Sequence, residues 1–148
     1  MTVYWGDKFL AIKNRLKDQI ALLEDDEGEL VFDEVKVGKK QKPVKDKSCI
    51  ILPVPIRASR ITVSKSVYNY RFDIRVIGKD NDIEDGLDEV VEYSNYIVAF
   101  LEDDRQFNHI CRNLEIINID PDVERPRART RHELSILAEF ETHGIPSG

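Results

Sequence analysis

The segment DNDIEDG, residues 80–86, resembles the start of a calcium-binding loop. Alternating acidic side chains are typical of the first half of a calcium-binding loop, which also needs a central glycine and a bidentate glutamate at its end. Here Gly86 comes one position late, and Val91 stands where the glutamate belongs. The acidic residues are better explained as the first turn of a helix, with Asp82 as its N-cap.

Histidine and cysteine are sparse. His109, His132 and His143 follow one another at intervals of 23 and 11 residues, which is not the spacing of a metal site on a helix or a ribbon. Cys49 and Cys111 lie 62 positions apart in apolar surroundings. This pattern predicts two small buried thiols in a reducing compartment, and neither a disulfide nor a metal site.

Catalytic groups form no recognisable constellation. The sequence has no glycine-rich phosphate loop and no serine in a nucleophile elbow. Asp73, between Arg71 and Arg75, is more simply a partner in cross-strand ion pairs than a catalytic acid. An enzyme would need a pocket that carries Asp73, His132 or Cys111, and this stays the third alternative. The sequence therefore predicts a protein that is not an enzyme, with no catalytic residue, no cofactor and no metal.

Basic residues are concentrated in two short segments of an acidic chain. The net charge of the whole chain is -6; residues 36–47 contribute +5 and residues 125–131 contribute +4, which leaves -15 for everything else. The basic residues of these two segments are Lys36, Lys39, Lys40, Lys42, Lys45, Lys47, Arg125, Arg127, Arg129 and Arg131.

A solvated loop that simply collects lysines would explain the first segment. The second is harder to explain in this way, because its alternating arginines share one face of an extended strand and repel one another unless something acidic lies opposite. Phosphate is one candidate, but neither segment contains the aromatic residues that stack on bases. The other is protein, including a second copy of the chain, because basic and acidic flanks suit a head-to-tail ring. We therefore predict that these ten side chains are assembly or DNA-passage contacts.

Two amphipathic helices are expected to position these segments. In the first, apolar residues recur at gaps of three and four over residues 5–23, and Gly28 is expected to end the helix. The second lies within residues 79–104, with Asp82 as its N-cap. The apolar face of the first helix comprises Trp5, Phe9, Ile12, Leu16, Ile20 and Leu23, and that of the second Leu87, Val90, Val91, Ser94, Ile97, Val98 and Leu101.

Five strands are expected around the helices. The first covers residues 30–37, and the second, CIILPVPI, has an edge position because Pro53 and Pro55 remove N–H groups from one side only. The third, YNYRFDIRVIG, alternates strictly between apolar and polar residues. The fourth, RNLEIINID, is apolar on both faces, which predicts a central strand. The fifth points Leu134 and Ile136 inward and Ser135 outward.

The order α-β-β-β-α-β-β predicts an α+β fold: a mainly antiparallel sheet of about five strands with two amphipathic helices packed on one face. Its 148 residues suit a single domain, 1–148, with a flexible basic connection at about 38–48 and a frayed tail at 143–148. No apolar run is long enough to span a bilayer and the N-terminus lacks the pattern of a signal peptide. We expect synthesis in the cytoplasm and no membrane contact.

Over nearly its full length, this order of elements resembles the tail terminator, or tail completion, proteins of tailed bacteriophages. The segments that carry the resemblance are the N-terminal amphipathic helix, CIILPVPI, YNYRFDIRVIG, the acid-capped helix DIEDGLDEVVEYSNYIVAFL, LEIINID and RHELSILAEFE. The resemblance rests on size and element order, and the same fold order hosts other functions.

The resemblance implies a structural virion protein of the tail or neck. Such a protein forms a ring, usually of six copies, at the head-proximal end of the tail tube, where it ends tube polymerisation and joins the tail to the head connector. The implied partners are other copies of the chain, the tube protein, the connector protein and, without sequence preference, DNA in the lumen. The alternatives are a head-tail joining protein of the neck, or a small non-enzymatic adaptor or nucleic-acid-binding accessory domain.

Overall fold

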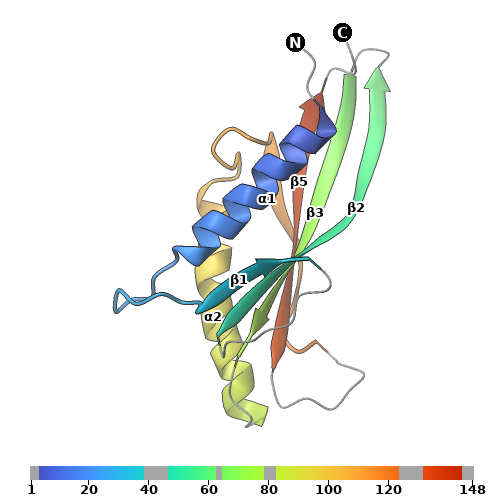
Figure 1. The fold of residues 1–148 in the computed structure, drawn as a ribbon. Helices are drawn as coiled ribbons and strands as arrows, with labels where there is room; N and C mark the ends of the chain where they lie inside the picture. The colour runs from blue at the N-terminus through green and yellow to red at the C-terminus, as the bar shows by residue number, and fades with distance from the viewer. Residues whose placement is uncertain (1–3, 39–46, 63–64, 79–82, 124–131, 145–148) are drawn as a thin grey trace.

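The computed structural model describes residues 4–38, 47–62, 65–78, 83–123 and 132–144. Two helices and five strands follow one another in the order α-β-β-β-α-β-β, as the sequence predicts (Figure 1). The elements are α1 (Trp5–Ala21), β1 (Glu34–Val37), β2 (Ser48–Thr62), β3 (Lys65–Ile77), α2 (Ile83–Asp103), β4 (Asn113–Asp120) and β5 (Glu133–Gly144).

The five strands form one sheet in the order β1-β2-β3-β5-β4. Only the β1–β2 pair is parallel, and the other three pairs are antiparallel. The expected α+β class with a mainly antiparallel sheet is therefore confirmed. Both helices lie on the same face of the sheet, with α1 crossing in front of the strands and α2 beside their lower half (Figure 1). We call this the helix-covered face and the opposite one the polar face.

The core fills the space between the helices and the sheet. On β3 the side chains of Tyr70, Phe72, Ile74 and Val76 are all fully buried, and the polar residues between them point to the polar face. The residues that complete this core from α1, α2 and β5 are Ile12, Leu16, Ile20, Val90, Ile97, Leu101, Leu134, Ile136, Ala138 and Phe140. The helical and strand periodicities read from the sequence thus point to the same core.

Phenylalanine rings connect the layers of this core. Phe140 of β5 has its ring centroid 4.9 Å from that of Phe107 and 5.9 Å from that of Phe72. Phe9 of α1 stacks on Phe72 at 5.4 Å. These contacts tie α1, β3, β5 and the segment after α2 into one packed unit.

Three sequence-based boundaries differ from the structure. Helix α1 ends at Ala21 instead of running to Gly28. Gly28, at φ +81°, serves a tight turn in which Glu24 pairs with Leu30. Strand β1 begins at Glu34, four residues later than expected. At the other end, β5 continues through Gly144, so that His143 lies in the strand and not in a tail.

The position of β4 was also predicted wrongly. This strand is the outermost of the sheet, where a central strand was expected. Its isoleucines do not fill a second core: Ile117 and Ile119 are 42% and 44% exposed. Ile117 falls at a break in register between Ile116 and Asn118, the signature of a β-bulge.

A left-handed turn follows α2. Phe107, Asn108 and His109 have φ angles of 50°, 56° and 64°, a region that side chains other than glycine rarely occupy. The turn is held by the burial of Phe107 and by the Asn108 N–H, which donates to Asp104 Oδ2 at 2.6 Å. Lys8 also fastens it to α1, donating from Nζ to the Ile110 carbonyl at 3.2 Å.

Replacing His109 with glycine should stabilise the fold by about 0.5–1 kcal/mol, because glycine removes the left-handed strain and this gain exceeds the entropy that it adds to the unfolded chain. His109 is exposed, so the loss of its side chain removes little packing. Urea denaturation measures the change. An Asp18→Gly variant, on the exposed side of α1, is the control and should instead lose about 1 kcal/mol.

No helix among the described residues is both long and apolar enough to cross a membrane.

Candidate assembly surfaces

The structure describes two of the ten basic residues predicted as contacts, Lys36 and Lys47. Lys36 lies on β1 with its Nζ 3.5 Å from Glu34 Oε2. Lys47 precedes β2, and its Nζ lies 5.5 Å from the centroid of the Tyr93 ring of α2. Both therefore contact groups of their own chain. The other eight, Lys39, Lys40, Lys42, Lys45, Arg125, Arg127, Arg129 and Arg131, lie outside the described residues.

The residues of the enzyme alternative are not all on one side of the sheet. Asp73 points to the polar face, whereas Cys111 belongs to the core on the helix-covered face. His132 contributes its carbonyl, which accepts the Gly78 N–H at 3.1 Å next to the start of β5. Within the part of the chain that the structure describes, no group of three or more His, Cys, Asp and Glu side chains could hold a metal ion.

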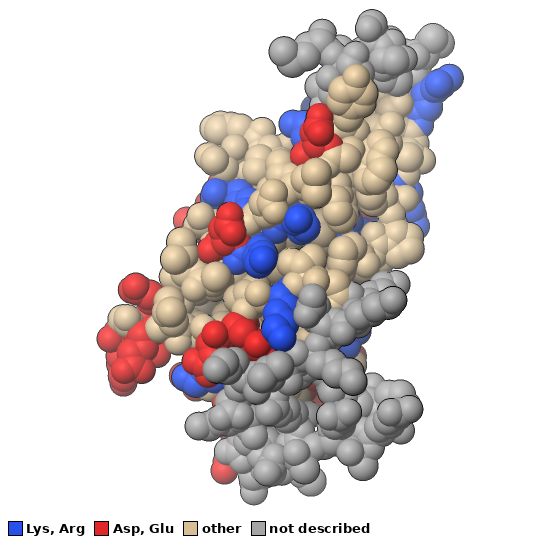
Figure 2. Space-filling view, in the orientation of Figure 1, with Lys and Arg blue, Asp and Glu red and all other residues tan. Residues whose placement is uncertain are grey.

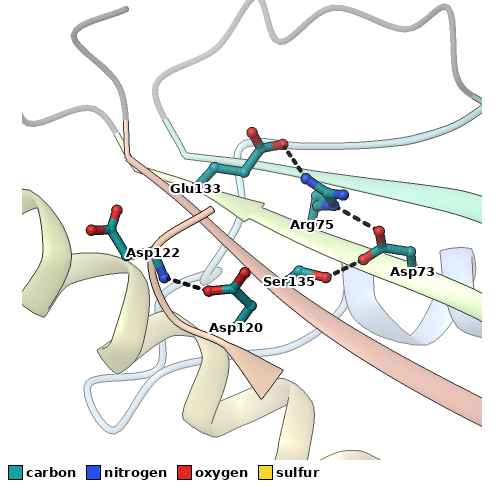
Figure 3. A network of polar contacts seen from close by, with 6 residues as sticks. All are labelled: Asp73, Arg75, Asp120, Asp122, Glu133 and Ser135. Carbon is teal, nitrogen blue, oxygen red and sulfur yellow. Dashed lines mark hydrogen bonds and ion pairs between the residues drawn. The ribbon is translucent and has the colours of Figure 1, made fainter. Parts of the chain in front are cut away.

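The polar face carries an ion-pair network (Figure 3). Asp73 on β3 accepts from Arg75 Nε at 2.8 Å and from the hydroxyl of Ser135 on β5. Arg75 in turn reaches Glu133, with Nη1 and Oε1 3.6 Å apart. The sequence predicted that Asp73 forms an ion pair, but its partner is on the same strand, and its cross-strand partner is a serine.

A second cross-strand pair lies farther along the same face. Arg71 Nε on β3 donates to Glu139 Oε2 on β5 at 2.7 Å. The side chains of both are about three-quarters buried or more, at 26% and 19% exposed. Arg71 and Arg75 on the polar face are therefore each paired with carboxylates of the same face.

One edge of the sheet is the outer side of β2. β1 pairs only with Ser48–Ile51, so the rest of β2 extends past it. The Ile51 carbonyl accepts the Gly38 N–H at 2.9 Å, so Ile51 faces β1. Pro53, two residues on, faces the same outer side, where its missing N–H costs no pairing. Beyond Ile51, β2 therefore has the edge position that its prolines predicted.

The outer part of β2 is basic. Arg57 and Arg60 are exposed, and the sequence of β2 contains no acidic residue. In the space-filling view, basic and no acidic side chains mark the margin on the side of β2, while acidic side chains gather at the opposite margin over the turn after α1 (Figure 2). We call the segment Leu52–Thr62 the basic edge.

The opposite edge of the sheet is β4, which pairs only with β5 among the described strands. Between β4 and α2 runs a groove of about 440 Å³ that continues into a smaller one of about 200 Å³, and Glu102 lines both. We call the two together the α2–β4 groove. Its larger part is lined by Val91, Ser94, Asn95, Val98, Ala99, Glu102, Ile119, Pro121 and Leu134.

The flank around this groove is acidic. The sequences of α2 and β4 contain nine acidic residues and no basic one. Asp122 continues this charge just past β4, where its N–H donates to Asp120 Oδ1 at 3.2 Å (Figure 3). Two arginines interrupt this charge among the described residues: Arg105, which lines the smaller part of the groove, and Arg112, which directly precedes β4. The four arginines of residues 125–131 follow β4 in the sequence and lie outside the described residues. Among the described elements, the sheet therefore ends in a basic edge on β2 and an acidic, grooved edge on β4.

Burial shifts the pKa values of the two cysteine thiols. Burial raises the pKa of the Cys111 thiol to about 11, and the nearby charge of Asp104 adds to the effect. Burial likewise raises the pKa of Cys49, whose side chain is inaccessible on β2. Both thiols therefore remain protonated at neutral pH, as expected for buried structural cysteines.

Cys111 should react with a thiol reagent about 100-fold more slowly at pH 8 than free cysteine, because only the thiolate reacts and the raised pKa keeps its population small. Above pH 8 the rate should continue to rise until the pH nears 11, whereas the rate of free cysteine levels off earlier. A Cys49→Ala variant isolates the Cys111 signal in a spectrophotometric assay. A rate that levels off near pH 9 would contradict the assigned pKa.

Neither the known protein-family models nor the curated proteins give a match to this chain.

Proposed function

We propose that this chain is a structural subunit that assembles head-to-tail with copies of itself into a closed ring. The observation that carries the proposal is the pair of unlike sheet edges: a basic edge on β2 and an acidic, grooved edge on β4. A surface that is not self-complementary but is complementary to another part of the same molecule favours a heterologous contact. Such contacts close into a ring when the rotation from one copy to the next divides a full turn.

The ring is proposed to be that of a bacteriophage tail terminator. Its partners, besides further copies of the chain, are then the tube and connector proteins. Support comes from the element order α-β-β-β-α-β-β, on which the resemblance to that family rests. A subunit in that position contacts two neighbours and two axial partners. The polar face and the exposed side of α1 leave surfaces for the axial partners once both edges are occupied.

Negative-stain electron microscopy of the purified protein, at low and high concentration, tests this function. The proposal expects closed rings with a central hole wide enough for duplex DNA. Open filaments would contradict ring closure. Monomers at every concentration, also after addition to headless phage tails, would contradict the terminator role.

The adaptor or nucleic-acid-binding alternative is favoured by one feature of the sequence, the two basic segments with charges of +5 and +4. It predicts tight binding to random duplex DNA with a steep dependence on salt, because each neutralised phosphate releases counterions. Weak binding is expected of the ring subunit, because the rest of the chain carries a net charge of -15 and repels a polyanion.

A further inference from the structure

The larger part of the α2–β4 groove is an apolar hollow. Its apolar lining includes Val91, Val98 and Ala99 of α2, together with Ile119 and Pro121. Ile119 pairs with Ile136, a core residue, so its side chain points to the helix-covered face, on the side of α2. Val91 and Ile119 are nevertheless 39% and 44% exposed. Exposed apolar surface of this kind is typical of a protein contact.

The hollow has room for an aromatic side chain. Its volume is about 440 Å³, whereas a cavity of about 150 Å³ already holds a benzene ring. Glu102 lines it, and Asp88 and Glu92 are exposed on the same helix, close in sequence to Val91. Helical spacing places Asp88, three residues before Val91, on the side of α2 that lines the groove. An occupant should therefore be apolar and free of carboxylates that would face this border.

The chain itself exposes few apolar side chains that meet these conditions. The large ones among the described residues are Tyr4, Trp5, Leu10, Leu22, Leu30, Val91, Ile117 and Ile119. The last three belong to α2 and β4 themselves. Leu22 and Leu30 adjoin a turn, residues 24–29, whose exposed carboxylates would be repelled by Glu102. Leu10 is a single aliphatic side chain, which leaves the aromatic pair at the start of α1.

Tyr4 and Trp5, which we call the aromatic tip, are 63% and 54% exposed. The Trp5 carbonyl accepts the Tyr70 hydroxyl at 2.9 Å, and the Trp5 ring lies edge-on to Phe9 with the centroids 6.2 Å apart. Backbone and ring are therefore both held in place. Asp7 projects from another side of the helix, because two residues turn it by about 200°. Aromatic side chains held in this way are typical of the residues that carry binding energy.

The aromatic tip cannot reach the groove of its own chain. Thr142 of β5 lies beside the tip, whereas Leu134 of the same strand lines the groove. These two residues are eight positions apart on an extended strand, a separation of roughly 27 Å at about 3.4 Å per residue. Figure 1 shows the start of α1 beside the end of β5, and α2 beside the opposite half of the sheet. A contact between tip and groove therefore joins two copies.

We propose that the α2–β4 groove of one copy receives the aromatic tip of the next. This inference rests on the proposed ring and names a contact that builds it. Tip and groove are different surfaces, so the contact is heterologous, as a ring requires. Ala58 of the basic edge pairs with Tyr68, which lies beside the tip. The contact therefore also brings the basic edge of one copy toward the acidic flank of the next.

The fluorescence of Trp5 tests the inference in the wild-type protein, because Trp5 is the only tryptophan in the chain. Over a concentration series, assembly should move its emission to shorter wavelengths and protect it from the soluble quencher acrylamide. Sedimentation velocity on the same samples measures assembly independently. An assembled wild type whose Trp5 emission and quenching remain those of the monomer would overturn the inference while the ring stands.

Two substitutions remove the contact, one from each side. Trp5→Ala (tip variant) truncates the anchor, and Ala99→Phe (groove variant) places a ring in the groove. Each should assemble at least about 30-fold more weakly, the loss typical of an interface hot spot. Both replaced side chains are exposed, so each variant should unfold near the temperature of the wild type. Leu22→Ala and Ala21→Phe make the matched changes at exposed positions at the other end of α1 and should assemble normally.

Mixing the two variants makes the test specific. The groove variant keeps its tip and the tip variant keeps its groove, so the two can join through one contact only. The expected product is a heterodimer of one copy of each, with nothing larger. Because the tip variant contains no tryptophan, its addition to the groove variant should move the emission of the remaining Trp5 to shorter wavelengths.

The results distinguish this inference from the ring itself. If wild type assembles and both variants assemble equally well, the tip and the groove are not the subunit contact, and the inference is wrong while the ring stands. If the mixture shows neither heterodimer nor emission shift at 100 times the concentration at which wild type assembles, the two surfaces do not meet and the inference is also overturned. If wild type never assembles, the proposed function fails and the inference with it.

Discussion

A Phe140→Ala variant is expected to lose about 3–5 kcal/mol of unfolding free energy, the cost of a large buried cavity. The Phe140 side chain is inaccessible to solvent, and its ring contacts Phe107 and Phe72 at centroid distances of 4.9 and 5.9 Å. These partners belong to the left-handed turn and to β3, two elements that cannot easily move into the space. The cavity should therefore stay open, which places the loss toward the upper end of the range.

Chemical denaturation followed by circular dichroism measures this loss. Leu22→Ala is the matched control, because Leu22 is 66% exposed and its truncation should change the unfolding free energy by less than about 0.5 kcal/mol. A loss below about 1 kcal/mol in the Phe140→Ala variant would mean that the aromatic contacts do not support the core.

An Asp73→Ala variant is expected to lose about 2–3 kcal/mol, because it leaves two polar partners without their acceptor. Arg75 Nε donates to Asp73 at 2.8 Å, and the Ser135 hydroxyl also donates to it. The side chains of Asp73 and Arg75 are only 17% and 24% exposed, so water replaces the lost carboxylate poorly. Arg75 keeps a weaker partner in Glu133 at 3.6 Å, which limits the loss.

An Asp73→Asn variant separates the contribution of the hydrogen bonds to the unfolding free energy from that of the charge. Its side-chain oxygen can still accept from Ser135, so we expect a smaller loss of about 1 kcal/mol. The loss in Asp73→Ala should persist at high salt, since half-buried pairs are screened little. A loss that disappears in 1 M salt would show that the network acts only as a solvated surface pair.

Much of the fold could be predicted from the sequence because side-chain periodicity is a local property. The buried faces of α1, β3 and β5 follow directly from spacings of three to four residues and of two residues. The side chains of β5 alternate between the two faces as expected, and Leu137, the one apolar residue at an outward position, lies half-buried on the polar face.

The failures concern properties that local periodicity does not determine. The isoleucines of NLEIINID fit a central strand as well as an edge strand with a bulge, and only the pairing partners decide between them. Gly28 fits a helix end as well as a hairpin turn, and the pairing of Glu24 with Leu30 selects the turn. The position of β4 and the role of Gly28 both depend on contacts between residues that the sequence pattern does not specify.

The sequence predicted the type of surface, flanks of opposite charge, but not the residues that form it. Opposite charges on separate flanks were expected, yet the described basic flank is built by Arg57 and Arg60, two isolated arginines outside both basic segments. The signal that points to them is the absence of acidic residues over the 15 residues of β2. The α2–β4 groove leaves no comparable signal, because it forms between elements that meet only in the folded chain.

The central claim is that this chain closes head-to-tail into a ring, and native mass spectrometry over a range of concentrations tests it most directly. A closed ring predicts one dominant assembly at a fixed multiple of the 17.1 kDa chain mass, which does not grow as the concentration rises. A monomer at every concentration, or a continuous ladder of ever larger species, would contradict it.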